Sequence, residues 1–367
     1  MNESKNTILA IVLSGLVLLI WQYYFGLPYL EKQKQAQPTP QQQSQPVAGS
    51  PQRAQQPGSS AQLPTAPVAG QPERPLARAE ALGKSQRIEF DTPQIRGSIA
   101  LTGGRIDDVS LKRYRETVDP NSPYIDLLSP SGSPHPFYAE FGWLAGTGTA
   151  VKVPTSETVW QQQGTGSLGV GQPVTLMWDN GEGLQFRRTI SVDDRYVFSI
   201  RDEVVNRAEA PVTLSPYALI SRHGTPPTLG YYILHEGLIG VLGEQGLQEV
   251  TYKSIEEKKR MTFKVSNAWL GITDKYWAAT LLPDVSAQVQ AEFAAGSVGS
   301  VATYQTDYLL DPQTIAPGAT GSAESRLFAG AKEVSVVDGY EKALHLNRFE
   351  LLIDWVGSIS SPSRCSN

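Results

Sequence analysis

Residues 87–111 read RIEFDTPQIRGSIALTGGRIDDVSL, and this stretch predicts the fold of most of the chain. Apolar and polar residues alternate in short runs, which is typical of strands with one buried face. Gly103-Gly104 separates the runs Ile99–Leu101 and Ile106–Val109. Two glycines at such a point favour a tight hairpin, because both central residues of the turn need positive φ. The stretch therefore predicts antiparallel strands.

The same pattern continues to about residue 328, without the helical periods that would separate the strands of a parallel sheet. Residues 85–329 are therefore predicted to form a large antiparallel β-sandwich, and the fold class is mainly β. One helix is expected at Lys253–Arg260, which is too charged for a buried strand. Further strands are expected at residues 174–178, 184–192, 196–205, 212–220, 262–265, 269–273, 276–282, 287–293 and 301–308.

Residues 1–30 contain an uncharged apolar run, Asn6–Leu30, between Lys5 and Glu31. About 20 apolar residues cross a bilayer as a helix, so the run predicts an N-terminal transmembrane anchor that contacts lipid. A cleaved signal peptide or a buried core helix are the alternatives, and the first should end in small residues. Aromatic residues stand there instead, and we expect them at the membrane interface: Trp21, Tyr23 and Tyr24.

The orientation of this anchor stays open, because Lys5 lies before the run and Lys32 and Lys34 lie after it. Residues 31–84 are rich in Gln, Pro, Ala, Ser and Gly and lack aromatic residues. Such a composition cannot bury enough apolar area to fold, so we expect a disordered Gln/Pro-rich linker.

Residues 330–356 change to a helical period and are predicted to form C-terminal amphipathic helices. Asn347 could cap the second of these, whose apolar face would carry Phe349 and Leu352. Phe349, Leu352 and Trp355 are then expected either at lipid headgroups or against the base of the domain. Residues 357–367 are a polar tail outside this pattern.

Composition excludes several kinds of chemistry. The chain has 367 residues, a net charge of −5 and a single cysteine, so neither an intrachain disulfide nor nucleic acid as a partner is expected. Four scattered histidines show no spacing of a metal site, and no cofactor is expected. Gly164–Gly169 matches a dinucleotide motif in letters only and is predicted to be a loop. The acidic pairs Asp107-Asp108 and Asp193-Asp194 are predicted on solvated turns rather than in catalysis.

One constellation keeps an enzymatic alternative open. Glu140, Glu203 and His223 could meet across a sandwich and act on a sugar, although the sequence cannot bring them together. The alternative function is therefore a membrane-anchored periplasmic β-sandwich that binds or epimerises carbohydrate. A purely structural envelope protein is a third possibility.

The order of these parts resembles the N-terminal portion of the bacterial YidC membrane-protein insertase family of Gram-negative type. The resemblance rests on IALTGGRIDDVSL (Ile99–Leu111), on AWLGITDKYWAATLLP (Ala268–Pro283) and on YEKALHLNRFELLIDW (Tyr340–Trp355). The most specific part is WLGITDKYW. We expect a family-signature surface there, made of Trp269, Gly271, Asp274, Lys275, Tyr276 and Trp277.

The resemblance implies a non-enzymatic insertase and chaperone in the bacterial inner membrane, with nascent membrane proteins and the Sec translocon as partners. It implies a cytoplasmic N-terminus, with the bulk of the chain forming a periplasmic, mutarotase-like supersandwich. In the family, further membrane spans follow the segment that matches Leu351–Trp355, whereas here VGSISSPSRCSN follows. We therefore expect a chain truncated before the second span, without the insertase core and inactive alone.

Overall fold

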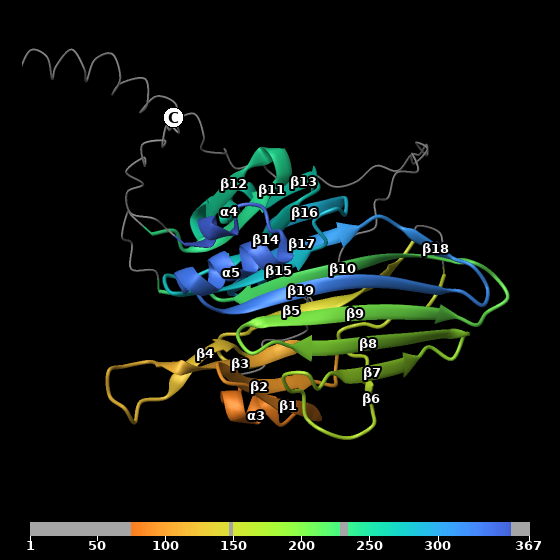
Figure 1. The fold of residues 1–367 in the computed structure, drawn as a ribbon, viewed down its shortest axis with the longest axis horizontal. Coiled ribbons are helices and arrows are strands. Elements are labelled where there is room, and N and C mark those ends of the chain that lie inside the picture. Colours follow the sequence, from red (N-terminus) through yellow and green to blue (C-terminus); the bar gives the residue numbers. More distant parts are fainter. Residues whose placement is uncertain (1–74, 147–149, 228–233, 354–367) are drawn as a thin grey trace, which may run out of the picture. The chain divides into compact units, whose positions relative to one another are not determined.

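A computed structural model describes residues 75–146, 150–227 and 234–353. The predicted anchor, the linker up to residue 74 and the tail lie outside these residues. Within the described part of the chain, no helix is long and apolar enough to cross a membrane. What it contains is a mainly β domain of two packed antiparallel sheets, which confirms the predicted sandwich (Figure 1).

The first sheet runs in the order β1-β2-β3-β5-β10-β17-β16-β13, with β4 paired to β3 and β18 paired to β10. All its pairs are antiparallel. Its strands are β1 (Arg87–Asp91), β2 (Ile95–Ala100), β3 (Ile106–Arg115), β4 (Tyr124–Leu128), β5 (Phe137–Ala145), β10 (Val212–His223), β13 (Arg260–Val265), β16 (Val289–Val298), β17 (Val301–Leu310) and β18 (Gln313–Ile315).

The second sheet runs in the order β12-β11-β14-β15-β19-β9-β8-β7-β6. It pairs strands from both halves of the domain, since β9 lies beside β19. Its strands are β6 (Gln161–Gln163), β7 (Val174–Asp179), β8 (Leu184–Val192), β9 (Val197–Asn206), β11 (Gly237–Leu242), β12 (Leu247–Thr251), β14 (Ala268–Thr273), β15 (Trp277–Pro283) and β19 (Thr320–Ala331).

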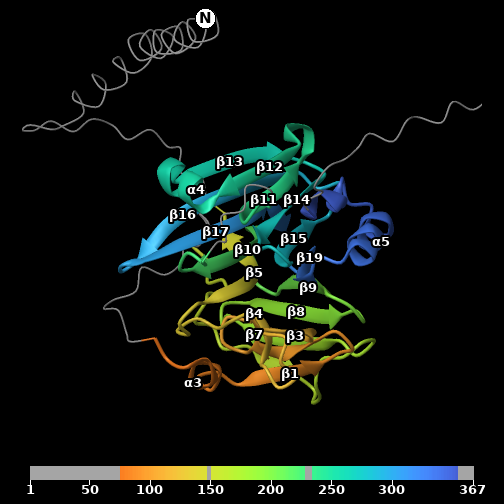
Figure 2. The same ribbon diagram turned by 90° about the vertical axis from the view of Figure 1, so that its left-hand side faces the viewer.

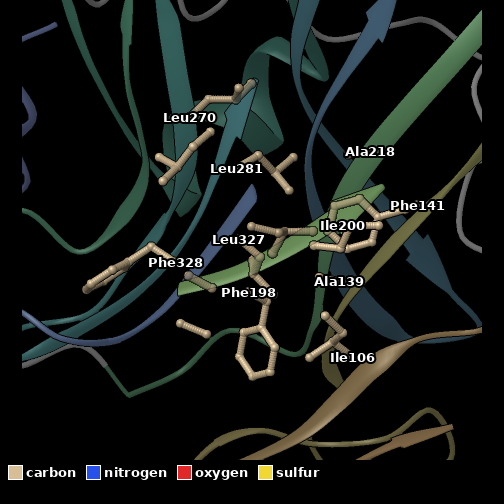
Figure 3. Packing of buried hydrophobic residues seen from close by; sticks show 14 of the residues in the cluster. Ile106, Ala139, Phe141, Phe198, Ile200, Ala218, Leu270, Leu281, Leu327 and Phe328 are labelled. Atoms are coloured by element: carbon tan, nitrogen blue, oxygen red, sulfur yellow. The ribbon is translucent and has the colours of Figure 1, made fainter. Parts of the chain in front are cut away.

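The core lies between the two sheets, where alternate residues of each strand face inward. Each fully buried large apolar side chain contributes about 1.5–3 kcal/mol to stability. Figure 3 shows side chains of both sheets meeting there. The labelled residues that meet there are Ile106, Ala139, Phe141 and Ala218 from the first sheet and Phe198, Ile200, Leu270, Leu281 and Leu327 from the second. Phe328, also labelled, lies on the other face of the second sheet, with its ring centroid 6.0 Å from that of Tyr340.

The hairpin predicted at Gly103-Gly104 is confirmed. Both glycines have positive φ, 75° and 61°. They connect β2 to β3, where Ile99 pairs with Ile106. Most of the other predicted strands match observed ones within three residues at each end. The predicted helix at 253–260 is α4 (Tyr252–Lys258), which Thr251 caps by accepting a hydrogen bond from the Ser254 amide.

A short helix, α3 (Arg78–Leu82), falls within the segment predicted as linker. Arg78 fastens it to the first sheet through ion pairs with Asp108 and Asp126. A charged contact of this kind leaves no signal in the composition of the segment.

The end of the described chain differs from the prediction. Helix α5 (Val334–Leu344) lies beside the second sheet in both views (Figures 1 and 2). Its Tyr340 hydroxyl donates to Asp193 Oδ2 at 2.6 Å and accepts from the Tyr196 amide at 3.0 Å. The second α-helix expected from Asn347 is wrong for the described residues, because only the 3-10 turn η3 (Phe349–Leu352) forms. Arg348 precedes this turn with φ of 53°, and no side chain caps it.

Candidate functional site

The family-signature segment divides between the core and the surface. Trp269 on β14 is fully buried, and its indole Nε1 donates to the Asn347 carbonyl at 2.9 Å. Its ring meets Phe349 edge to face, with centroids 5.2 Å apart. Trp269 therefore holds the end of the domain against the second sheet rather than forming a surface.

Gly271, also on β14, is required by packing. A Cβ at this position would lie 2.2 Å from the Ala279 carbonyl oxygen and 2.7 Å from the Thr280 Cα, both on β15. No side chain fits such a gap between paired strands. Gly271 therefore allows β14 and β15 to pair closely beside the loop that joins them at residues 274–276.

The remaining signature residues line one cleft of about 800 Å³. Asp274, Lys275, Tyr276 and Trp277 follow β14 and open β15. We name this feature the aromatic cleft, after Tyr114, Tyr276 and Trp277. Its other lining residues include Ile125, Arg222, Leu234, Lys332 and Ile353.

The three rings of the aromatic cleft touch in sequence. The centroids of Tyr276 and Trp277 are 5.7 Å apart, and those of Trp277 and Tyr114 are 6.3 Å apart. Tyr276 is 56% exposed, which is unusual for a large ring, whereas Tyr114 and Trp277 are half-buried. An accessible ring beside two partly buried ones offers an apolar, weakly hydrated binding surface.

Charged groups surround these rings. Arg222 Nη1 donates to Asp274 Oδ1 at 2.6 Å and to the Tyr252 hydroxyl at 3.2 Å. This network, drawn from β10 and α4, fixes the loop that carries Tyr276. Lys275 Nζ lies 4.9 Å from the centre of the Tyr276 ring. Burial, together with the Glu333 carboxylate, raises the pKa of Tyr114, so its hydroxyl stays neutral at physiological pH.

The structure places the predicted membrane-interface residues in two groups. Phe349 and Leu352 are buried in the domain, at 0% and 1% exposure, and pack into the main core. Of the two positions expected from the sequence, lipid headgroups or the base of the domain, these two side chains occupy the second. Only the neighbouring Ile353 reaches the aromatic cleft. Trp21, Tyr23, Tyr24 and Trp355 lie outside the described residues.

Of the three residues of the carbohydrate alternative, only Glu140 and His223 lie near each other, and Glu203 lies elsewhere. Glu140 and His223 share the outer face of the first sheet, whereas Glu203 lies on β9 of the second sheet and pairs with Arg201. Both oxygens of Glu140 are occupied, by Arg105 Nε at 2.7 Å and the Tyr217 hydroxyl at 2.9 Å. In this arrangement the carboxylate orders side chains and has no free oxygen for a substrate.

His223 lies beside this ion pair, with Nε2 3.5 Å from the Tyr138 hydroxyl. Burial, together with the Arg105 guanidinium, lowers the pKa of His223 to about 4. The imidazole is therefore neutral near pH 7. Among the described residues, no group of three or more acidic, histidine or cysteine side chains is arranged to hold a metal ion.

One acidic pair is not where the sequence predicted it. Asp107 and Asp108 lie on β3 and are buried, bound to Arg87 and Arg78 respectively. A register shift between Ser98 and Ile99 brings both carboxylates to the arginines, which the alternation rule cannot anticipate. By contrast, Asp193-Asp194 does lie on the β8–β9 turn, where Asp193 accepts backbone amides.

Tyr114 and Arg222 are lining residues of the aromatic cleft that the sequence did not predict. Tyr114 is the penultimate residue of β3, far from Trp277 along the chain, and its only signal was an aromatic residue near the end of a strand. Arg222 lies on β10, and nothing in the sequence around it indicates a site. Its role depends on the ion pair with Asp274, which follows another strand.

The family model described as YidC periplasmic domain matches residues 87–358. The membrane protein insertase YidC of Bradyrhizobium diazoefficiens is 58% identical over 97% of this chain and 60% of its own length. That of Nitrobacter hamburgensis is 58% identical over 97% of this chain and 58% of its own length.

These matches and the fold define a periplasmic β-sandwich domain of a bacterial inner-membrane protein. The chain belongs to the YidC membrane protein insertase family, which confirms the resemblance. It spans about 60% of the length of these relatives.

Two solved structures are similar to this chain at low identity and low TM-score. A galactose mutarotase-like protein from Lactobacillus casei gives a TM-score of 0.40 at 11% identity, covering 66% of this chain and 100% of that one. A putative aldose 1-epimerase from Escherichia coli gives 0.41 at 8% identity, covering 68% and 100%.

Proposed function

We propose that this chain supplies the anchor and the periplasmic domain of a membrane protein insertase that assists insertion and folding of inner-membrane proteins. The match of residues 87–358 to the periplasmic domain carries this proposal, together with 58% identity to an insertase over nearly the whole chain. The N-terminus would then be cytoplasmic, residues 6–30 would cross the membrane, and nascent membrane proteins and the Sec translocon would be partners.

The aromatic cleft is the part of the domain suited to bind a polypeptide. Its rings are accessible and apolar, while Arg222 and Asp274 hold the loop that presents them. A half-buried aromatic surface bordered by charges is typical of sites that hold an extended chain.

A chimera tests the insertase role. Residues 1–353 of this chain would replace the matching part of the Bradyrhizobium insertase in cells depleted of their own. We expect growth and insertion of a single-span reporter to recover. If the chimera accumulates in the membrane but the reporter stays uninserted, the proposal is wrong.

The orientation has its own test. Tyr276→Cys in a Cys365→Ser background should react with a membrane-impermeant maleimide in intact spheroplasts, because Tyr276 is exposed. Cysteine introduced at Lys5 should react only after lysis. The reverse pattern would overturn the proposed topology.

A further inference from the structure

The aromatic cleft has the chemistry of a surface that binds proline-rich polypeptide. Such segments adopt the polyproline II conformation, which is extended and rigid, and they dock on aromatic-lined grooves. Three rings at successive spacings of 5.7 Å and 6.3 Å provide such a lining, and Leu234 and Ile353 extend it. Little conformational entropy is lost when a stiff segment of this kind binds.

The chain carries a matching segment immediately before the described domain. Residues 63–75 read LPTAPVAGQPERP and contain two P-x-x-P pairs, Pro64/Pro67 and Pro72/Pro75. In polyproline II, three residues make one turn of about 9 Å, so the two prolines of a pair lie on the same edge. Prolines at this separation can rest on different rings of the aromatic cleft.

The segment ends beside β4, a strand that also contributes to the cleft. Leu76, next to Pro75, donates its amide to the Gly132 carbonyl at 2.9 Å, and Arg78 Nε lies 3.3 Å from Asp126 Oδ2 on β4. The residue before Asp126 is Ile125, whose side chain lines the aromatic cleft from the opposite face of the same strand. Among the described strands, β4 pairs with β3 alone, so its other edge offers a path between the two faces. Eleven residues at about 3.1 Å each reach roughly 34 Å in the polyproline II conformation.

We propose that residues 64–75 of this chain bind in the aromatic cleft of the same molecule and cover Tyr276, Trp277 and Tyr114. This inference rests on the proposed role of the cleft as a polypeptide-binding surface. Weak contacts suffice because the ligand is tethered. At an effective concentration of about 1 mM, a contact with a Kd of about 1 mM would be occupied half the time. The segment then regulates the cleft, since any other polypeptide has to displace it.

Photo-crosslinking tests the proposal in the full chain, in its membrane. Benzoylphenylalanine replaces Tyr276, an exposed position that tolerates a larger ring. We expect an intramolecular crosslink whose modified peptide, identified by mass spectrometry, lies within residues 64–75. The variant with Pro64, Pro67, Pro72 and Pro75 changed to Ala should lower the yield at least fivefold. The matched control changes Pro38, Pro40, Pro46 and Pro51 to Ala and should leave the yield unchanged.

A probe placed in the segment instead of the cleft tests the same contact without altering Tyr276. Benzoylphenylalanine at Ala66 should crosslink to the cleft, and Tyr114→Ala should weaken that crosslink at least fivefold. Crosslinks from Tyr276 that reach only a foreign polypeptide would overturn the inference and leave the proposed function standing. Crosslinks between two copies, or equal yields from both proline variants, would also overturn it.

Discussion

Arg188 on β8 and Asp202 on β9 form a two-point ion pair inside the core, with Nε 2.7 Å from Oδ1 and Nη2 3.0 Å from Oδ2. The guanidinium, 1% exposed, also donates to the carbonyls of Gly104 and Phe141 across the interior. One cation thus joins the two sheets beneath the hairpin. Its carbonyl partners lose their hydrogen bonds if it is removed.

Arg188→Ala should therefore lower the free energy of unfolding by about 3–5 kcal/mol, because it leaves Asp202 charged, buried and unpaired. Asp202→Ala should cost a similar amount. The control is Arg201→Ala on the same strand as Asp202, where the exposed Arg201 forms an ion pair with Glu203 at the surface that contributes about 0–1 kcal/mol. Chemical denaturation of the three variants checks this, and equal losses at positions 188 and 201 would contradict it.

Protonation of His223 should destabilise the domain at acidic pH. Its pKa is about 4 when folded and about 6.5 when unfolded, so the unfolded state binds a proton first as the pH falls. Stability that is present above pH 6.5 is lost between pH 6.5 and 4. Between pH 7.5 and 4.5, the wild type should lose about 1–3 kcal/mol more than His223→Gln.

His345→Gln, at an exposed position, provides the control for replacing a histidine by glutamine. Unfolding midpoints at several pH values give the comparison. Parallel curves for the wild type and His223→Gln would show that this imidazole does not titrate differently on folding.

The ionisation of Asp307 on β17 should make the stability of the domain depend on pH in the opposite direction. Burial is the main cause that raises its pKa to about 7, and the nearby Glu292 adds to it, while Oδ1 has no hydrogen-bond partner. The folded state therefore holds a proton that the unfolded state releases near pH 4, and stability falls as the pH rises from 4 to 7.

Asp307→Asn should accordingly stabilise the protein by about 1–3 kcal/mol at pH 8, with the gain shrinking towards pH 5. Asp311→Asn, at an exposed position four residues later, is the matched control substitution. Thermal unfolding of both variants at pH 5 and 8 measures the effect. A loss of stability at pH 8 for Asp307→Asn would refute the assignment.

Gly271→Ala should destabilise the domain by about 2–4 kcal/mol, since its Cβ would enter the backbone of β15. Gly339→Ala is the matched change, because nothing lies within 4 Å of a Cβ there and the residue is inside α5. Alanine favours a helix by about 0.5–1 kcal/mol over glycine, so this variant should be more stable. Opposite shifts in the unfolding midpoint are expected, and equal shifts would contradict the argument.

Local rules predicted most of the sandwich. Gly103-Gly104 predicts the hairpin because a tight turn depends on the backbone conformation of its own residues. The helix α4 was predicted from a run of charged residues that a buried strand does not accommodate. Alternation also located most strands of both sheets. It did not assign them to a sheet, because pairing such as β9 with β19 depends on contacts between residues more than 100 positions apart.

The candidate site was predictable only in part. Asp274 to Trp277 were singled out by family resemblance, whereas Tyr114 and Arg222 join them through the tertiary fold alone. Asp107 and Asp108 were misplaced because a neighbouring bulge overrides the rule that acidic pairs mark turns. The helix expected at Asn347 failed because the burial of Phe349 under Trp269 favours a short turn over continued helix.

The contact between Trp269 and Asn347 has a mechanical consequence. A pull on the chain beyond Ile353 would meet η3 first and then the indole that holds it. That indole belongs to β14, which is hydrogen-bonded to β11 on one side and to β15 on the other. Tension would therefore enter the sheet at an inner strand and load two ladders of hydrogen bonds at once. A domain fastened in this way would bear tension from its C-terminal side without peeling from an edge.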